Sequence, residues 1–419
     1  MTTLSRHTPS PPRSSHASDR TFKYIAYAII FIVGSARLCF GMDDSHFYRA
    51  RTWPGEPRTP KQELWSFDTT LMGTSTHTSR NRLGEKAPLL GIYGSEDTNL
   101  LGINTGAAQL AYAGSFSLFE AQFQGYFNFS HGIFAHIHLP FRSIRLEETG
   151  LKNTHANRNC SYNTISAATQ RLDDIFKTRG IDTDTVKKNG IGDLSILAGW
   201  SRTTYDSRAV DFFDVALQTG ILFPTGKKKN PHALFDIPLG YNGHFALPVI
   251  VDMSTGILGW LNFGAHLESR FFFNSDEYIR PVAKQNQSGI VRLADPQKVR
   301  MHSGPLWNMS VYIKADHCMR GFSFIMGYSH DQKQKDRVEY IISGDRCVPD
   351  RNYIYQHDPF LDHWNMNILH ALMEYDWATE DNPYGPRIGL EYNYVINGEN
   401  IFNGSTTAEH IGLDCDWSF

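Results

Sequence analysis

Hydrophobic and polar residues alternate one by one over stretches of about ten residues in this chain, and this alternation constrains the fold more than any other feature. In the stretch 118–129, Phe119 and Phe123 share one face of an extended segment, and Glu120 and Gln122 share the other. A β-strand that separates lipid from a polar lumen needs such a two-residue period. The strands of a soluble β-sandwich alternate in the same way, so the pattern by itself leaves both architectures open.

Connection lengths separate these two architectures. The connection 79–116 is long, residue 130 forms a tight turn, 147–189 is long and 205–208 is short, and the same alternation continues along the chain. Barrels of the outer membrane have long extracellular loops and short periplasmic turns on alternate connections. The sequence therefore predicts an all-β fold: a transmembrane, antiparallel, up-and-down β-barrel with a polar lumen and about twelve strands, within a range of about ten to fourteen. The expected strands are 62–78, 117–129, 131–146, 190–204, 209–223, 244–253, 256–273, 304–316, 320–332, 363–378, 385–397 and 408–419.

The stretch 100–112 keeps the strand number open. It fits a strand, a short helix or a segment folded into the lumen, and a strand pair there would raise the count to about fourteen. Composition agrees with a barrel, because 41% hydrophobic and 13% aromatic residues coexist with a mean hydropathy of -0.37. The single long apolar run lies near the N-terminus, which excludes a helical membrane protein, and a net charge of -3 argues against nucleic acid as a partner.

The N-terminal stretch 1–41 has the features of a secretory signal peptide. A basic, polar region leads into the apolar run Tyr24–Val33, which Arg37 ends before it reaches the roughly twenty residues of a membrane-spanning helix. Cleavage is expected between Ser35 and Gly41, with an uncleaved anchor or lipidation at Cys39 as the weaker alternatives. We therefore expect export to the outer membrane, a periplasmic N-terminal segment at 42–61, and the barrel from 62 to 419.

The C-terminal strand carries an insertion signal. Trp417 and Phe419 lie on one face at period two, and a terminal Phe with an aromatic residue two positions earlier resembles the signal that barrel-insertion machinery recognises. The expected partners are thus that machinery, outer-membrane lipid and a small-molecule solute that the sequence does not identify.

Acidic, basic and imidazole side chains alternate with the apolar face along the expected strands. Such a mixture predicts a hydrogen-bonded interior, either a narrow channel or one closed by ion pairs across the lumen. Twelve strands give a lumen between the side-chain-filled eight-stranded barrel and the sixteen-stranded porin, so a small or plugged pore is expected. The residues expected to line the lumen are Glu120, His136, His138, Arg142, Asp193, Asp214, His266, Glu268, Arg270, Lys314 and Glu391.

Two short motifs carry a family resemblance. Gly190-Ile-Gly-Asp193 opens one expected strand, and Pro224-Thr-Gly226 closes the next. Together they resemble the paired motifs of outer-membrane barrels of the meta-pathway phenol-degradation or toluene-transporter-like family. The resemblance implies a barrel of that type and the passage of small solutes, hydrophobic ones among them. Physically, both motifs turn the chain at strand ends, because Gly-Asp can satisfy exposed backbone donors and Pro lacks the N–H that a strand ladder needs.

The sequence gives little support for a catalytic or metal-binding site. The cysteines show no CxxC spacing for zinc, and Cys160 with Cys347, both in expected outer loops, is the best candidate pair for a disulfide. His136 and His138 line one face of a strand without a nucleophile and an orienting group beside them. We therefore expect no catalytic site, no metal and no cofactor.

Three functions remain, in descending order of support. The first is a channel or transporter for small solutes, and the second is a surface barrel that anchors binding loops such as 147–189. The third is a membrane-embedded lipid-modifying enzyme. A lumen packed shut by side chains would favour the anchor over the channel.

Overall fold

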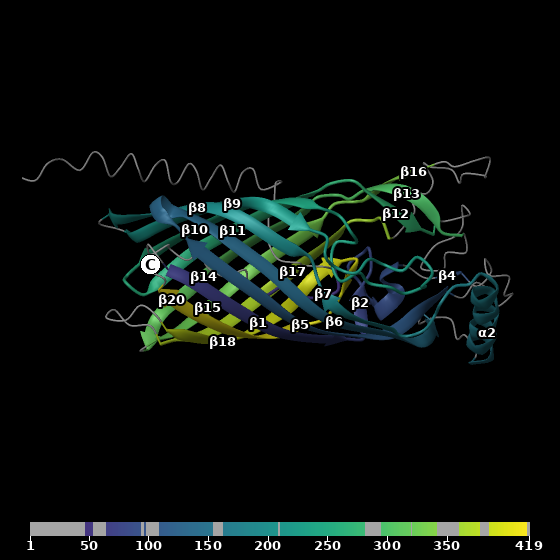
Figure 1. Ribbon diagram of the computed structural model, residues 1–419. Coiled ribbons are helices and arrows are strands. Elements are labelled where there is room, and N and C mark those ends of the chain that lie inside the picture. Colours follow the sequence, from purple (N-terminus) through teal and green to yellow (C-terminus); the bar gives the residue numbers. More distant parts are fainter. Residues whose placement is uncertain are drawn as a thin grey trace, which may run out of the picture.

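The chain folds into one closed antiparallel barrel (Figure 1). The computed structural model describes residues 47–52, 64–93, 96–97, 109–153, 162–207, 210–280, 295–319, 321–341, 360–377 and 385–416. Within these residues twelve strands form the wall as an unbroken ring of antiparallel pairs, which confirms the predicted barrel and its strand number. In chain order the wall strands are β1 (Leu64–Thr76), β5 (Gln109–Asn128), β6 (Ile133–Asn153), β8 (Leu194–Ser207), β9 (Val210–Phe223), β10 (Ala246–Ile257), β11 (Leu261–Phe272), β14 (Leu306–Met319), β15 (Phe322–Lys333), β17 (Trp364–Asp376), β18 (Pro386–Glu399) and β20 (Thr406–Asp416).

The wall is apolar outside and polar inside. Along β15, Phe324 and Met326 are exposed by 43% and 58%, whereas Ser323 before them and Ser329 after them are buried. Successive side chains of a strand point to opposite faces, so the two-residue period of the sequence becomes an apolar outer belt and a polar interior. The same alternation recurs on the neighbouring strands β14 and β17, which pair with β15 in antiparallel register.

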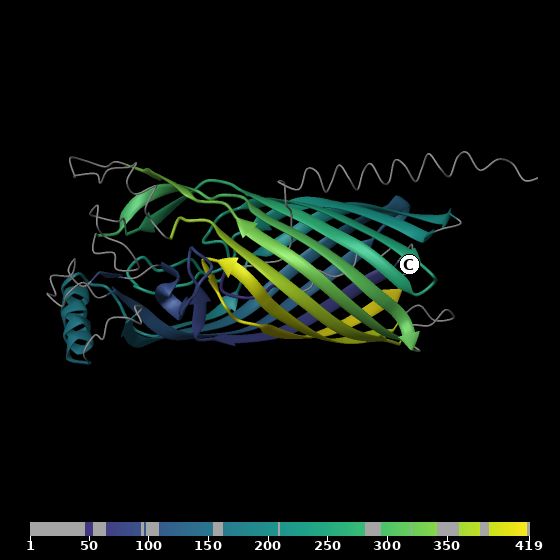
Figure 2. The same ribbon diagram turned by 180° about the vertical axis from the view of Figure 1, so that it is seen from behind.

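Short and long connections gather at opposite ends of the barrel. Figures 1 and 2 show the tight turns and the end of β20 at one end, here named the turn end, and the elaborate connections at the other, here named the loop end. Several strand boundaries differ from the sequence prediction, and two of these differences affect the arrangement of the wall. β5 begins already at Gln109, so part of the undecided stretch 100–112 belongs to the wall. The turn between β10 and β11 lies at Leu258–Trp260 rather than 254–255, because Leu258 and Gly259 adopt positive φ.

The loop end carries its own small elements. One sheet contains β19 (Ile401–Phe402), β2 (Thr78–Arg80) and β3 (Lys86–Pro88), and a second contains β12 (Ser275–Ile279), β13 (Gln297–His302) and β16 (Arg337–Tyr340). β4 (Glu96–Asp97) pairs with β5, and β7 (Val186–Ile191) continues the wall beside β6. The helices are α2 (Tyr162–Thr178) and the short 3-10 helices η1 (Leu89–Tyr93) and η2 (Ser130–Gly132), and no described helix has the length and apolarity to cross a membrane.

The main hydrophobic core lies at the loop end. Tyr48, Leu89, Phe116, Phe235 and Phe402 are all buried in it. These residues come from the N-terminal part of the chain, from η1, from β5, from the connection 224–245 and from β19. The core therefore ties the long connections to the barrel mouth and holds them as a fixed structure above the lumen.

Candidate functional site

A short segment of the N-terminal region lies inside the barrel. Residues 47–52 precede β1, yet Tyr48, Arg49, Ala50 and Arg51 have no solvent-accessible surface. The backbone is fixed at both ends of this segment: Phe402 N–H donates to the Phe47 carbonyl over 2.8 Å, and the Thr406 hydroxyl donates to the Ala50 carbonyl over 3.0 Å. We name residues 47–52 the plug. The sequence predicts a periplasmic segment at 42–61, whereas the described part of that range, 47–52, is enclosed by the barrel.

Arg49 joins the plug to one side of the wall. Its Nη2 lies 3.3 Å from Oε1 of Glu120 on β5, and both side chains are fully buried. The other oxygen of Glu120 accepts a hydrogen bond of 2.9 Å from Nε of Arg142 on β6. Gln122 Nε2 donates to Oε1 of the same carboxylate over 2.8 Å. Glu120 is therefore the acceptor for two guanidinium groups, one from the wall and one from the plug.

Arg51 joins the plug to the far side of the wall. Its Nη1 lies 3.7 Å from Oδ1 of Asp331 on β15, and its Nη2 lies 3.4 Å from Nε2 of His266 on β11. Both β11 and β15 are five strands away from β5 around the twelve-stranded circle. The two arginines consequently bridge opposite sides of the lumen.

A chain of polar contacts continues around the interior from this point. His266 Nδ1 pairs with Asp252 on β10, and Asp252 accepts a hydrogen bond of 3.3 Å from Gln218 on β9. Gln218 Oε1 lies 3.3 Å from Nδ1 of His136 on β6, whose ring stacks on Tyr126 at 4.1 Å. The side chains of His266, Asp252, Gln218 and His136 are buried and that of Tyr126 is partly buried, so the contacts fill the interior at this height instead of lining an open pore.

A second polar cluster occupies the wall of β15, β17, β18 and β20. The Ser329 hydroxyl lies 2.7 Å from Nε2 of His370, and Nδ1 of His370 lies 2.6 Å from Oδ1 of Asn393. Glu391 pairs with both His370 and His410. Serine, histidine and asparagine stand here in the order of nucleophile, base and orienting group. All three are buried and inward-facing, so the serine is closed to lipid, which a lipid-modifying enzyme would have to reach.

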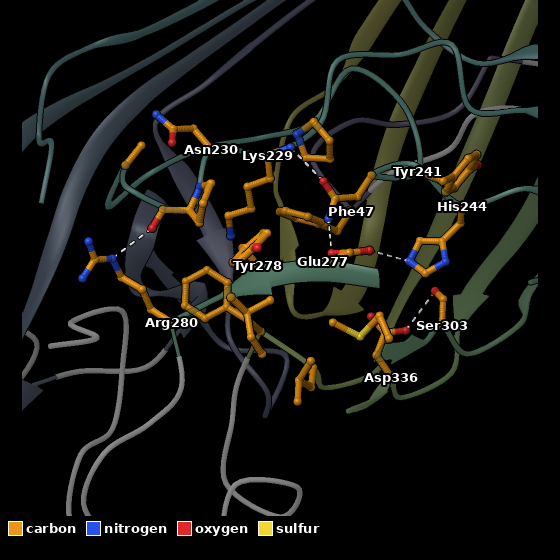
Figure 3. A pocket seen from close by; sticks show the side chains of 18 of the residues that line it. Phe47, Lys229, Asn230, Tyr241, His244, Glu277, Tyr278, Arg280, Ser303 and Asp336 are labelled. Atoms are coloured by element: carbon orange, nitrogen blue, oxygen red, sulfur yellow. Dashed lines mark hydrogen bonds and ion pairs between the residues drawn. The ribbon is translucent and has the colours of Figure 1, made fainter. Parts of the chain in front are cut away.

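A cavity of about 240 Å³ lies at the loop end, directly above the plug (Figure 3). Phe47 of the plug forms part of its wall, and most other lining residues come from the connection 224–245, from β12, and from the residues before and at the start of β17. Lys229 places its Nζ 4.3 Å from the ring centre of Phe360 within this cavity. The aromatic side chains that line it are Phe47, Tyr241, Tyr278, Phe360 and Trp364.

The two motifs of the family resemblance meet at the edge of this cavity. Asp193 Oδ1 accepts a hydrogen bond of 2.8 Å from the Gly226 amide, and Oδ2 accepts one of 2.5 Å from the Tyr241 amide. Thr225 donates to the Gly192 carbonyl over 2.6 Å. The motifs therefore lock the ends of β8 and β9 together. Asp193 was expected to line the lumen, and it is buried, but its carboxylate serves the backbone of the connection 224–245.

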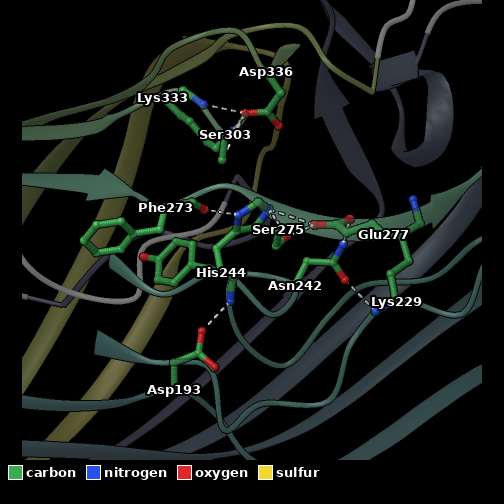
Figure 4. A network of polar contacts seen from close by, with 12 residues as sticks. Asp193, Lys229, Asn242, His244, Phe273, Ser275, Glu277, Ser303, Lys333 and Asp336 are labelled. Carbon is green, nitrogen blue, oxygen red and sulfur yellow. Dashed lines mark hydrogen bonds and ion pairs between the residues drawn. The ribbon is translucent and has the colours of Figure 1, made fainter. Parts of the chain in front are cut away.

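Glu277 fastens β12 to the same connection (Figure 4). Its Oε1 lies 2.7 Å from Nε2 of His244, and its Oε2 accepts a hydrogen bond from Asn242. His244 Nδ1 in turn lies 2.9 Å from the carbonyl of Phe273. These contacts hold one side of the cavity in a fixed position relative to the wall.

All eleven residues expected to face the lumen have buried side chains. The structure brings some together and keeps others apart. Glu120 meets Arg142, Glu268 meets Arg270 over 2.9 Å, and His136 connects to His266 through Gln218 and Asp252. Lys314 pairs with Asp316 over 3.1 Å, Asp214 lies 3.4 Å from Ser254, and Glu391 pairs with His370 and His410. Whether these side chains contact a passing solute stays a prediction.

Several sequence predictions fall outside the described residues: the signal peptide 1–41, the insertion signal Trp417 and Phe419, and the candidate disulfide Cys160 with Cys347. Among the residues that the structure does describe, no group of His, Cys, Asp or Glu side chains is arranged to hold a metal ion.

Sequence reasoning missed the plug and part of the interior. Asp252, Asp331 and His370 stand at inward positions of expected strands and could have been found by extending the alternation. Arg49 and Arg51 lie in a stretch without hydrophobic periodicity. Nothing in that stretch indicates its partners, which follow many residues later in the chain.

The protein resembles known proteins in its fold, and no family match was found. No protein-family model matches the sequence, and no curated protein matches it. Among solved structures, the protein is similar to an outer membrane channel from Pseudomonas putida F1, with a TM-score of 0.51 and 8% identity over 87% of this chain and 100% of that one. The toluene transporter TodX of Pseudomonas putida (TM-score 0.33, 8% identity, 91% of this chain and 100% of that one) and a FadL homologue of Pseudomonas aeruginosa (0.32, 8%, 85% and 91%) score too low to support an argument. The fold, confirmed independently by the strand topology, is that of an outer-membrane β-barrel.

Proposed function

We propose that the protein is a gated channel for small solutes in the outer membrane, and that the plug holds it closed in this structure. The apolar outer belt supports a membrane location, because such a surface is stable only in contact with lipid. The fold shared with a solved outer membrane channel supports transport. Insertion into lipid by the barrel-insertion machinery, after export with a cleaved signal peptide, belongs to the same proposal.

One observation carries the proposal: the material that closes the lumen includes a separate segment of chain. Wall side chains cannot leave a barrel, but the plug belongs to the region before β1, and its side-chain ion pairs to the wall include those of Arg49 with Glu120 and Arg51 with Asp331. Tyr48 of the plug also packs in the hydrophobic core of the loop end, but the plug belongs to no strand of the wall, so it can change position without breaking a strand ladder. The cavity above it, which Phe47 helps to line, provides a place from which a solute can reach the plug.

A closed interior also supports the second candidate, a barrel that anchors binding loops. The loop end presents a three-stranded sheet and α2 beyond the wall (Figure 1), which such an anchor would display. One experiment separates the two functions.

The experiment compares single-channel recordings of the full chain with those of the double variant Arg49→Gln, Arg51→Gln in planar bilayers. The gated channel predicts rare openings of the full chain and frequent, discrete openings of the variant, since both ion pairs of the plug are lost. The matched control is Arg82→Gln, Arg145→Gln, which removes two arginines with side chains 65% and 53% exposed at the loop end and should behave as the full chain. A correctly folded but silent double variant would favour the anchor.

A further inference from the structure

The wall of the lumen has an excess of acidic side chains. Among the described strands of the wall, the buried carboxylates are Glu120, Asp214, Asp252, Glu268, Asp331 and Glu391, and the buried cationic side chains are Arg142, Arg270 and Lys314. Six carboxylates thus face three permanent cations. Inward-facing carboxylates are the feature by which protein pores attract cations and repel anions.

The plug compensates part of this excess with two arginines. Arg49 lies against Glu120 and Arg51 against Asp331, both inside the closed barrel. Removing one partner from a buried ion pair is strongly unfavourable because an uncompensated charge remains in a medium of low dielectric constant. When the plug leaves, Glu120 keeps Arg142 as its partner, whereas Asp331 loses the guanidinium group of Arg51, so a cation that enters the lumen can take that position.

The cavity above the plug adds a second requirement. Aromatic rings line it, and one of them, Phe360, already lies beside the ammonium group of Lys229 at 4.3 Å. Aromatic faces attract cations and also bind apolar groups. A solute that is stable both in this cavity and beside the carboxylates below carries a positive charge on an apolar body.

We propose that the cargo of the channel is a small organic cation, an ammonium, amidinium or guanidinium group on an apolar or aromatic body, and that the plug arginines occupy its transit sites as a tethered substitute. This inference rests on the proposed channel function. It also implies that neutral hydrocarbons are not the cargo, because charged and hydrogen-bonding side chains line the middle of the lumen.

The test uses two ions of similar size and opposite charge, benzylammonium and benzoate. Reversal potentials of the Arg49→Gln, Arg51→Gln variant, measured in gradients of benzylammonium chloride and of sodium benzoate, should show a several-fold preference for benzylammonium over chloride and little passage of benzoate. Adding Asp331→Asn to this variant should reduce the preference. Asp276→Asn, which removes an acidic side chain 37% exposed at the loop end, serves as the matched control and should leave the preference unchanged.

A second readout does not depend on conductance. Benzylammonium that binds at the vacated carboxylates should raise the temperature of the heat-dependent gel-mobility shift of the double variant, and raise it less for the full chain, whose sites the plug fills. Conductance without cation preference would overturn the inference and leave the channel intact. A folded double variant that neither conducts nor gains thermal stability from benzylammonium would overturn both.

Discussion

Arg49 and Glu120 form an ion pair of 3.3 Å in which neither side chain has any accessible surface, although 71 residues separate them in the chain. Glu120 also binds Arg142 of the wall, so one carboxylate compensates two guanidinium groups. The charge of this shared carboxylate is thus compensated by the plug as well as by the wall. Loss of the Glu120 carboxylate should therefore reduce stability more than loss of an exposed acidic group.

Replacement of Glu120 by Gln should lower the free energy of unfolding by about 3–5 kcal/mol, because it leaves two buried guanidinium groups without their anion. Urea-dependent unfolding of the refolded protein in lipid bilayers measures this change. The comparison is Glu147→Gln, whose partner Arg145 is half exposed, and which should have a much smaller effect because solvent screens this pair. Equal effects of the two substitutions would contradict a special role for the buried pair.

Substitution of Asp193 by Ala should loosen the connection 224–245. The amides of Gly226 and Tyr241 would lose their acceptors, at a cost of about 1–3 kcal/mol for each unsatisfied donor. Limited proteolysis within the connection should become faster in the Asp193→Ala variant than in the parent. Asp193→Asn retains one acceptor oxygen and should give an intermediate rate of proteolysis. If the Asp193→Ala variant were cleaved as slowly as the parent, the motif would not hold the connection.

Glycine at position 240 should be indispensable for the same structure. A Cβ atom there would lie 2.2 Å from Oδ1 of Asp193, too close for any van der Waals contact. Gly240→Ala should therefore reduce the yield of heat-modifiable, folded barrel. Gly73→Ala, at a site with no atom within 4 Å of the added Cβ, should fold as the parent does.

Acid should weaken the sheet of β12, β13 and β16, which stands outside the wall at the loop end. The hydrogen bond from Lys298, against burial and with help from Arg300, lowers the pKa of Asp276 below its ordinary value. Because the pKa is lowered in the folded state, the carboxylate contributes its full stabilisation above the ordinary Asp pKa of about 3.9 and loses it as the pH falls through the lowered value. A carboxyl ¹³C titration of Asp276 should have its midpoint below that of an unstructured Asp, and a midpoint at or above it would contradict this assignment.

The wall could be predicted from the sequence because its determinants are local. A two-residue period decides which face of a strand meets lipid, and each expected strand required only its own residues, as in 117–129 and 320–332. The turn at Leu258 was displaced because a non-glycine residue takes a positive φ there, which composition does not indicate.

The closed site could be predicted only in part. Glu120, Arg142 and His266 were found at inward positions, but the partners Arg49 and Arg51 come from a segment without periodicity. Its place is decided by complementary charges on β5, β11 and β15, which meet only in the folded barrel. The Asp193 motif was recognised as a strand-end device, whereas its bond to the Tyr241 amide depends on how the intervening connection folds back.

The pairing of β1 with β20 runs from Leu64 opposite Asp416 to Thr74 opposite Thr406, so the two strands that seal the cylinder come from opposite ends of the described wall. Contacts of such large sequence separation form late, because the entropy of the intervening chain opposes them until other pairs exist. Closure should thus be the slow final step of assembly. A chain interrupted before Thr406 would present the edges of β1 and β18 without partners, and an unpaired edge in lipid or water invites association with another chain.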